Sequence, residues 1–226
     1  VAGSVGAMIA FVMKVRDPSI IARACELGVA MQLTNIARDV GEDAANGRLY
    51  LPRQWLRDEG IDPDLWLEKP IHSNSTKKII KKLLKTADTY YERSDHAIRV
   101  LPADCKRAIF AARFIYADIG NKIKHLDYNS IKKRAIVSLD RKIFLIIKSY
   151  LKSIMPSFLI DSKPSNIEAL SSIVFLVKPA YNLSKNFRCS TKPLSFFQRV
   201  NWVIELFVKL EARDRYQLAH PRHPPR

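Results

Sequence analysis

Apolar residues recur at intervals of three and four along most of the chain, a spacing that places them on one face of an α-helix. Glycine is scarce, with seven residues among 226. The predicted helices cover Val1–Val15, Ile20–Ala45, Thr76–Val100, Pro102 to beyond Lys124, Asp140–Ile154 and Leu194–Gln217. We therefore expect an all-α protein.

The helix predicted over Ile20–Ala45 has clear signals at both ends. Asp17 precedes Pro18, which is the arrangement of an N-cap residue before a proline at the first helical position. The pair Asn46-Gly47 favours the left-handed conformation that ends a helix. Between these signals we expect the helix to run unbroken to about Ala45.

The chain is expected to have three parts. These are a helical domain over residues 1–155, a helical extension over 156–219, and a disordered tail over 220–226. Val1 stands inside a predicted helix, so we expect a truncated N-terminus. The most apolar segment, Ile143–Ile160, is interrupted by two lysines and by Pro156, which argues against a membrane-spanning helix.

The formal net charge is +16, from 38 Lys and Arg against 22 Asp and Glu. No zinc-finger spacing, RNA-binding signature or helix-turn-helix accompanies this charge, so we expect no nucleic-acid partner. An anionic membrane surface or a diphosphate substrate explains it at least as well. Cys25, Cys105 and Cys189 lack metal-ligand spacing and suit a reducing compartment, so we expect a cytoplasmic protein.

One predicted helix has a basic face and an apolar face. The basic residues are Lys77, Lys78, Lys81, Lys82 and Lys85, and the apolar ones are Ile79, Ile80, Leu83 and Leu84. Such a helix can lie on an anionic bilayer, which would place the protein at the inner face of the membrane. A solvated surface helix is the more common explanation, and both interpretations stay open.

Candidate chemistry lies on the Ile20–Ala45 helix. Asn35, Asp39 and Asp43 follow one another at intervals of four residues, which places their oxygens on one stripe of the helix. Oxygen ligands in apolar surroundings suit Mg²⁺, and Arg38 and Arg48 are natural partners for phosphate. Ordinary ion pairs along a helix are the alternative explanation of the same residues.

Four segments resemble the squalene/phytoene synthase family. Gln32–Pro52, QLTNIARDVGEDAANGRLYLP, is similar to the second aspartate-rich motif of that family. Val1–Gly6 resembles the end of its VAG-x-VG motif, and Ala108–Ile123 resembles a late helix with a tyrosine that faces the substrate. Phe197–Arg215 resembles the C-terminal end of some bacterial phytoene synthases. The resemblance is strongest over Val1–Lys142.

The resemblance implies a single helical bundle of the isoprenoid synthase type around an apolar cavity. The implied residues are the metal ligands Asn35, Asp39 and Asp43, the catalytic pair Asp39 and Asp43, and the substrate contacts Gln32, Arg38, Arg48 and Tyr116. The implied cofactor is Mg²⁺, with Mn²⁺ as an alternative. The implied reaction joins two geranylgeranyl diphosphates head to head through prephytoene diphosphate to phytoene, a step of carotenoid biosynthesis, without a nicotinamide cofactor.

Two other functions stay open. The same fold could condense farnesyl diphosphate to presqualene diphosphate or squalene, or it could serve as a non-catalytic assembly subunit. The first aspartate-rich motif of the family belongs upstream of Val1 and is not in the chain. We therefore expect a bundle that is incomplete at its N-terminus, and we expect the 226-residue chain alone to make no phytoene.

Overall fold

The structure is a computed structural model that describes residues 2–154. The described residues form eight α-helices and no strand, which confirms the all-α prediction. The helices are α1 (Ala2–Val12), α2 (Pro18–Arg38), α3 (Val40–Ala45), α4 (Arg53–Asp58), α5 (Pro63–Glu68), α6 (Asn74–Arg99), α7 (Ala103–His125) and α8 (Leu139–Ile154). The predicted helix Leu194–Gln217, the extension and the tail lie outside this range.

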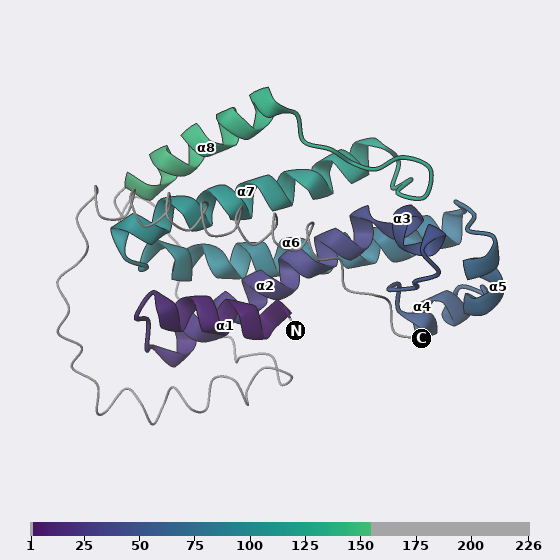
Figure 1. Ribbon diagram of the computed structural model, residues 1–226, viewed down its shortest axis with the longest axis horizontal. Helices are drawn as coiled ribbons and strands as arrows, with labels where there is room; N and C mark the ends of the chain where they lie inside the picture. The colour runs from purple at the N-terminus through teal and green to yellow at the C-terminus, as the bar shows by residue number, and fades with distance from the viewer. Residues whose placement is uncertain (1, 155–226) are drawn as a thin grey trace, which may run out of the picture. The chain divides into compact units, whose positions relative to one another are not determined.

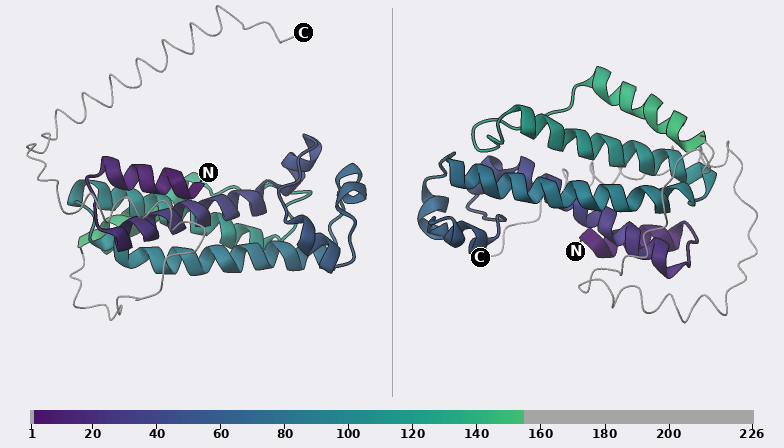
Figure 2. Two further views of the ribbon diagram at one scale, coloured as in Figure 1. Left: turned by 90° about the horizontal axis from the view of Figure 1, so that it is seen from below. Right: turned by 180° about the vertical axis from the view of Figure 1, so that it is seen from behind.

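Helix α2 is the central element of the bundle. It packs against α1, α6 and α7, and α8 in turn packs along α7 (Figures 1 and 2). The short helices α4 and α5 lie near the first turns of α6 (Figure 1). Helix α3 begins one residue after the C-cap of α2, so the C-terminal residues of α2 lie next to α3 at one end of the bundle.

The backbones of α1 and α2 approach each other closely. A Cβ atom added to Gly6 would lie 2.1 Å from the carbonyl oxygen of Ala24, and one added to Gly28 would lie 2.2 Å from that of Ala2. Neither position can accept a side chain without moving a helix. Gly6 belongs to the VAG-x-VG segment, so this packing is a physical reason for the glycine there.

Capping follows the sequence signals at the start of α2 and α6. The Oδ1 atom of Asp17 accepts hydrogen bonds from the backbone N–H groups of Ser19, at 2.8 Å, and Ile20, at 3.3 Å. The side chain of Ser73 accepts from the backbone N–H of Thr76, and the hydroxyl of Thr76 accepts from the backbone N–H of Ser73. This reciprocal capping starts α6 two residues before its predicted beginning.

The apolar face of α6 belongs to the core. Its members Ile79, Ile80, Leu83 and Leu84 are at most 2% exposed. Several lysines of the opposite face have partners: Lys77 pairs with Asp127, Lys78 with Glu59, and Lys82 lies over the ring of Trp55. Because the apolar side is already buried, α6 cannot insert it into a membrane, and the basic face is a solvated surface. No helix among the described residues is both long and apolar enough to span a bilayer.

The prediction of an unbroken helix to Ala45 is wrong at Asp39. Helix α2 ends at Arg38 and α3 begins at Val40. The backbone N–H of Gly41 donates to the carbonyl oxygen of Ser130, at 3.1 Å. The helical acceptor for that N–H would be Ala37, so a loop from a distant part of the chain bends the helix.

A buried ion-pair network joins α2 to α6. Glu26 is fully buried and pairs with Arg23 at 2.7 Å and with Arg93 of α6 at 2.6 Å. Burial raises the pKa of Glu26, and the two guanidinium groups oppose this effect. The network therefore stabilises the packing of α2 on α6 as long as all three members are present.

Replacing Glu26 by alanine is expected to lower the free energy of unfolding by about 3–5 kcal/mol, because two guanidinium groups lose their buried counter-ion. Urea denaturation of the 226-residue chain measures this loss. The matched control is Lys78→Ala, which removes an exposed pair and should cost less than about 1 kcal/mol. Equal losses for the two variants would show that the buried network stabilises the fold no more than an exposed ion pair does.

Candidate functional site

The polar residues predicted on one stripe gather around the bend between α2 and α3. Asn35 lies in the last turn of α2, Asp39 forms the bend, and Asp43 lies in α3. The backbone N–H of Asp39 donates to the carbonyl of Asn35, at 2.9 Å, and that of Asp43 donates to the carbonyl of Asp39, at 2.8 Å. The helical spacing of the three residues therefore survives the bend, and we call them the oxygen cluster.

Two arginines hold the carboxylate of Asp39. Arg38 donates to both of its oxygens, from Nε to Oδ1 at 2.7 Å and from Nη2 to Oδ2 at 2.6 Å. Arg134 donates from Nε to Oδ1 of Asp39 at 3.1 Å and pairs with Glu42 at 3.3 Å. Such forked donors also match the oxygens of a phosphate group.

Arg134 was not among the predicted site residues. It follows α7, 95 residues after Asp39, in the basic segment Lys132-Lys133-Arg134. The only signal in the sequence was this cluster of positive charge, which is also typical of a solvated loop. The contact between Gly41 and Ser130 carries the loop to the bend and brings Arg134 within reach of Asp39.

The pKa values of the two carboxyl groups of the cluster are shifted in opposite directions. Burial acts to raise the pKa of Asp39, but hydrogen bonds and charge from Arg38 and Arg134 outweigh it and leave that pKa below its ordinary value. The pKa of Asp43 is raised by burial and then by the negative charges of Asp39 and Glu42. Burial and two neighbouring carboxylates therefore disfavour the ionised form of Asp43, which a bound cation would favour.

The remaining predicted residues are Tyr116, Arg48 and Gln32, and they differ in whether they act on the charges of the cluster. Tyr116 of α7 is close enough to Arg38 to help raise its pKa, after the larger effects of the Asp39 carboxylate. Arg48 is exposed but acts electrostatically to lower the pKa of Asp43. Gln32 is exposed on α2, and its side chain makes no hydrogen bond to the described residues. The structure thus joins Tyr116 and Arg48 to the cluster and leaves Gln32 at its edge.

The oxygen cluster has the types of ligand that could hold a divalent cation. The Oδ1 atom of Asn35 is buried and has no hydrogen-bond partner among the described residues, which is costly unless something binds it. No group of three or more His, Cys, Asp or Glu residues in the described range is arranged to hold a metal ion. The cluster has two carboxylates and one amide, and Mg²⁺ is commonly held by one or two carboxylates together with substrate phosphate.

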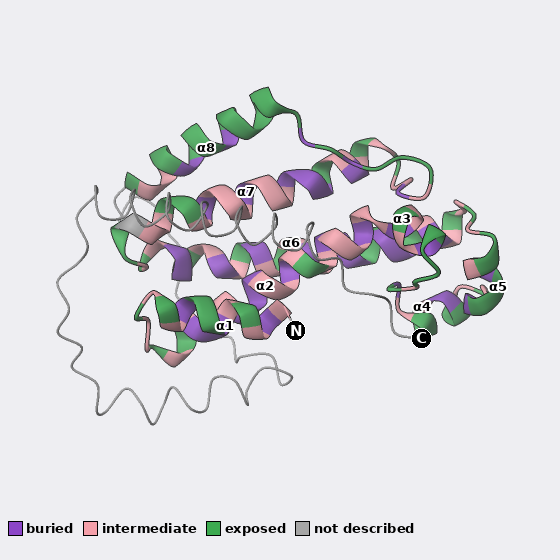
Figure 3. Ribbon diagram, viewed as in Figure 1, coloured by how far each residue is buried: buried purple, intermediate pink, exposed green. Residues whose placement is uncertain are grey.

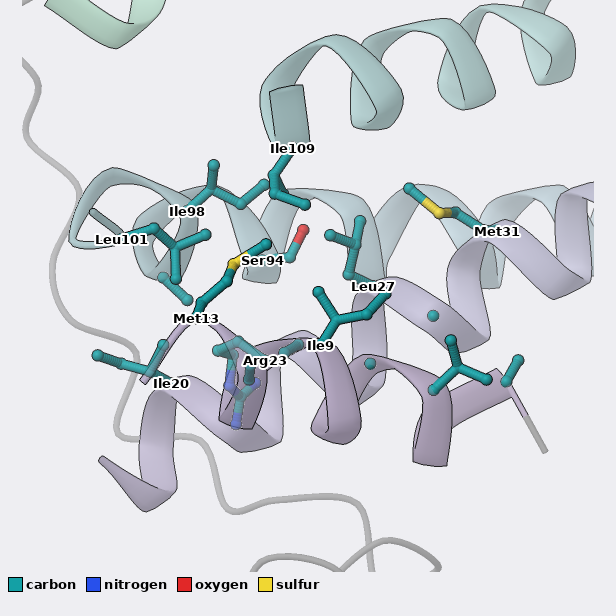
Figure 4. Close-up of a pocket in the computed structure, with 17 residues that line it drawn as sticks. Ile9, Met13, Ile20, Arg23, Leu27, Met31, Ser94, Ile98, Leu101 and Ile109 are labelled. Carbon is teal, nitrogen blue, oxygen red and sulfur yellow. The ribbon is translucent and has the colours of Figure 1, made fainter. Parts of the chain in front are cut away.

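An apolar groove runs along α2 away from the cluster. Its empty volume is about 640 Å³, including the part open to solvent, and residues of α1, α2, α6 and α7 line it. Met31 lies at one end, one turn before Asn35, and Met13, Ile20 and Leu101 lie at the other (Figure 4). Ile20 and Met31 are eleven residues apart, so the groove extends about 16 Å along α2.

Gly41 is the residue that allows the distant loop to reach the bend. A Cβ atom at this position would lie 2.2 Å from the carbonyl oxygen of Ile131, a distance that real Cβ contacts do not show. A side chain there would push the loop, and Arg134 with it, away from Asp39.

Gly41→Ala is expected to lower the free energy of unfolding by about 1–3 kcal/mol, because the loop must move to admit the methyl group. Thermal and urea denaturation measure this loss. Gly120→Ala is the matched control, since its Cβ would meet only Leu84 at the ordinary distance of 3.5 Å and alanine favours the helix. A stable Gly41→Ala variant would show that the loop is not held at this point.

The fold and the site together define a class of protein. The all-helical bundle has the fold of the isoprenoid synthases. A solved structure supports this class. The chain is 36% identical to a dehydrosqualene synthase crystallised with a ligand, with a TM-score of 0.51 over 59% of this chain and 48% of that one.

The chain belongs to the squalene/phytoene synthase family, whose model matches residues 1–141. It is 39% identical over 215 residues to the phytoene synthase of Rhodobacter capsulatus and 38% identical over 215 residues to that of Cereibacter sphaeroides. Both matches cover 95% of this chain, so the similarity continues past Lys142. The chain spans 60% of the length of the first relative and 58% of the second.

Proposed function

We propose that this chain supplies one side of the active site of a phytoene synthase. The observation that carries the proposal is the alignment of the oxygen cluster and its arginines with the apolar groove along α2. A prenyl diphosphate has the same division, with an anionic head and a long apolar tail. The relatives named phytoene synthase support the choice of product, geranylgeranyl diphosphate being the proposed substrate.

In this proposal Asn35, Asp39 and Asp43 hold Mg²⁺, with Mn²⁺ as an alternative. The ion would neutralise charge on the diphosphate and so make it a better leaving group. The unpartnered oxygen of Asn35 and the raised pKa of Asp43 support these ligands.

Arg38 and Arg134 have a second role in the proposal. Each now donates to Asp39, and each can donate instead to a diphosphate that binds beside it. This exchange would release the oxygens of Asp39 for the cation. Tyr116, Arg48 and Gln32 complete the proposed contacts to the diphosphate.

The proposed reaction balances without a redox cofactor. The allylic C–O bond of one geranylgeranyl diphosphate breaks, and its electron pair leaves with diphosphate. The double bond of the second substrate attacks the resulting cation, and loss of a proton gives prephytoene diphosphate. A second ionisation, rearrangement and proton loss give phytoene, so no nicotinamide cofactor is needed. The apolar walls of the groove would keep water from the cation.

A second candidate is condensation of farnesyl diphosphate. The similarity to a dehydrosqualene synthase favours it, since that name denotes a C30 product of the same type of coupling. The two candidates differ in the length of the hydrocarbon tail that the groove must hold.

We propose that the enzyme acts in the cytoplasm at the inner face of the membrane, because its substrates and product are lipids.

A chimera tests the proposed function. The part of the Rhodobacter capsulatus relative that this chain does not span is joined to the chain, and the product formed from geranylgeranyl diphosphate and Mg²⁺ is identified by mass spectrometry. Phytoene is expected, and Asp39→Asn should reduce its rate by roughly a hundredfold or more. Asp58→Asn, an exposed position outside the cluster, is the control. No phytoene from geranylgeranyl diphosphate while the same chimera converts farnesyl diphosphate to a C30 hydrocarbon, or an unaffected Asp39→Asn variant, would contradict the proposal.

The far end of the groove is expected to select the length of the tail. In the same chimera, Met13→Trp should fill that end and lower kcat/KM for geranylgeranyl diphosphate relative to farnesyl diphosphate by roughly tenfold or more. Val12→Trp is the control, because the side chain of Val12 is 81% exposed and does not line the groove. An unchanged ratio for Met13→Trp would show that the tail does not reach this end.

A further inference from the structure

The loop that links α7 to α8, residues 126–138, begins with two residues in the left-handed region of backbone conformation. Asp127 has a φ of 53° and Tyr128 has a φ of 58°. Residues other than glycine adopt this region rarely, and a bulky residue does so only where its surroundings hold it there. The start of the loop is therefore held by its contacts.

The backbone at this point forms a Schellman motif at the end of α7. The N–H of Tyr128 donates to the carbonyl of Ile123, at 2.9 Å, and that of Asp127 donates to the carbonyl of Lys124, at 3.1 Å. Glycine is the usual residue at the position that Asp127 occupies in this motif. Because glycine would end α7 there without steric cost, the carboxylate of Asp127 requires a second explanation.

The carboxylate of Asp127 forms an ion pair with Lys77, near the start of α6. A hydrogen bond from Lys77, together with its charge, holds the pKa of Asp127 below its ordinary value. The two partners are 50 residues apart in sequence, so the pair fastens the start of the loop to a distant helix. Both side chains are substantially exposed, and such a pair adds little to global stability, so its effect is local.

Three residues after Asp127 the loop reaches the bend between α2 and α3. Ser130 is 4% exposed, and its carbonyl accepts the hydrogen bond from the backbone N–H of Gly41. Figure 3 shows the loop mainly in the colours of exposed and intermediate residues, and Ser130 is the only buried residue among 126–134. Few buried contacts therefore hold the part of the loop that carries Arg134 to Asp39.

We propose that Asp127 is a positioning residue for Arg134. Its ion pair with Lys77 fixes the start of the loop, the short segment that follows carries this constraint to the bend, and Arg134 stays beside Asp39. Asp127 acts through Arg134, and its part in catalysis rests on the proposed function. The ion pair thus gives one lysine of the basic face of α6 a role at the site.

Hydrogen exchange at the backbone amide of Gly41 tests this constraint without any need for activity. In the whole 226-residue chain, Asp127→Gly and Lys77→Gln should each accelerate this exchange roughly threefold or more, as measured by NMR, because the loop opens more often. The amide of Ile80 in the core reports global unfolding and should keep its rate. Asp127→Gly should not lower the melting temperature, because glycine relieves the left-handed strain as the pair is lost.

Lys78→Gln is the matched control, since it removes the neighbouring exposed pair with Glu59 and should leave exchange at Gly41 unchanged. An unchanged rate at Gly41 in either Asp127→Gly or Lys77→Gln, or an equal rise in Lys78→Gln, would overturn the proposal. A parallel rise at Gly41 and in the core would also overturn it, because the pair would then serve global stability alone.

Kinetics of the chimera separate this proposal from the proposed function. Lys77→Gln should lower kcat/KM for geranylgeranyl diphosphate by roughly threefold, and it should have no effect in an Arg134→Ala background. Equal losses in the two backgrounds would show that Lys77 does not act through Arg134 and would overturn the positioning role. If the parent chimera makes no phytoene, the proposed function fails, and exchange at Gly41 still decides whether Asp127 holds the loop.

Discussion

The geometry of the site depends on direct backbone contact between the α2–α3 segment and its neighbours. At Gly28 and Gly41 this segment meets the carbonyl of Ala2 and that of Ile131 at distances that leave no room for a Cβ atom. The first contact holds α1 along the groove. The second bends the helix at Asp39 and places Arg134 within hydrogen-bond distance of Asp39. The apolar and polar halves of the site are thus positioned by the same kind of packing, which tolerates little displacement.

The sequence predicted the helices well because their signals are local. The Asp17-Pro18 start of α2 and the apolar spacing of α6 act within one or two turns, and the structure has the start of α2 and both ends of α6 within two residues of the predicted positions. The bend at Asp39 could not be predicted in this way. Its cause is a hydrogen bond from Gly41 to Ser130, which is far along the chain. No local sequence pattern predicts that these two residues meet.

The site was predicted in part for the same reason. The spacing of Asn35 and Asp43 is a property of one helix, and it survives in the structure. Arg134 was missed because its role comes from tertiary contact and not from its neighbours in sequence. The apolar spacing over Asp140–Ile154 predicted a helix, and most large apolar residues of α8 are exposed, since periodicity identifies an apolar face without showing what covers it.

The hold of two arginines on Asp39 has a consequence for the order of events at the site. A cation alone must compete with Arg38 and Arg134 for that carboxylate, and a diphosphate alone must take the arginines from it. If both bind as proposed, each would remove the obstacle to the other, so their affinities would be thermodynamically linked and reciprocal. In that proposal the pairing of Asp39 with Arg38 and Arg134 would disfavour binding of either a metal ion or a phosphate alone.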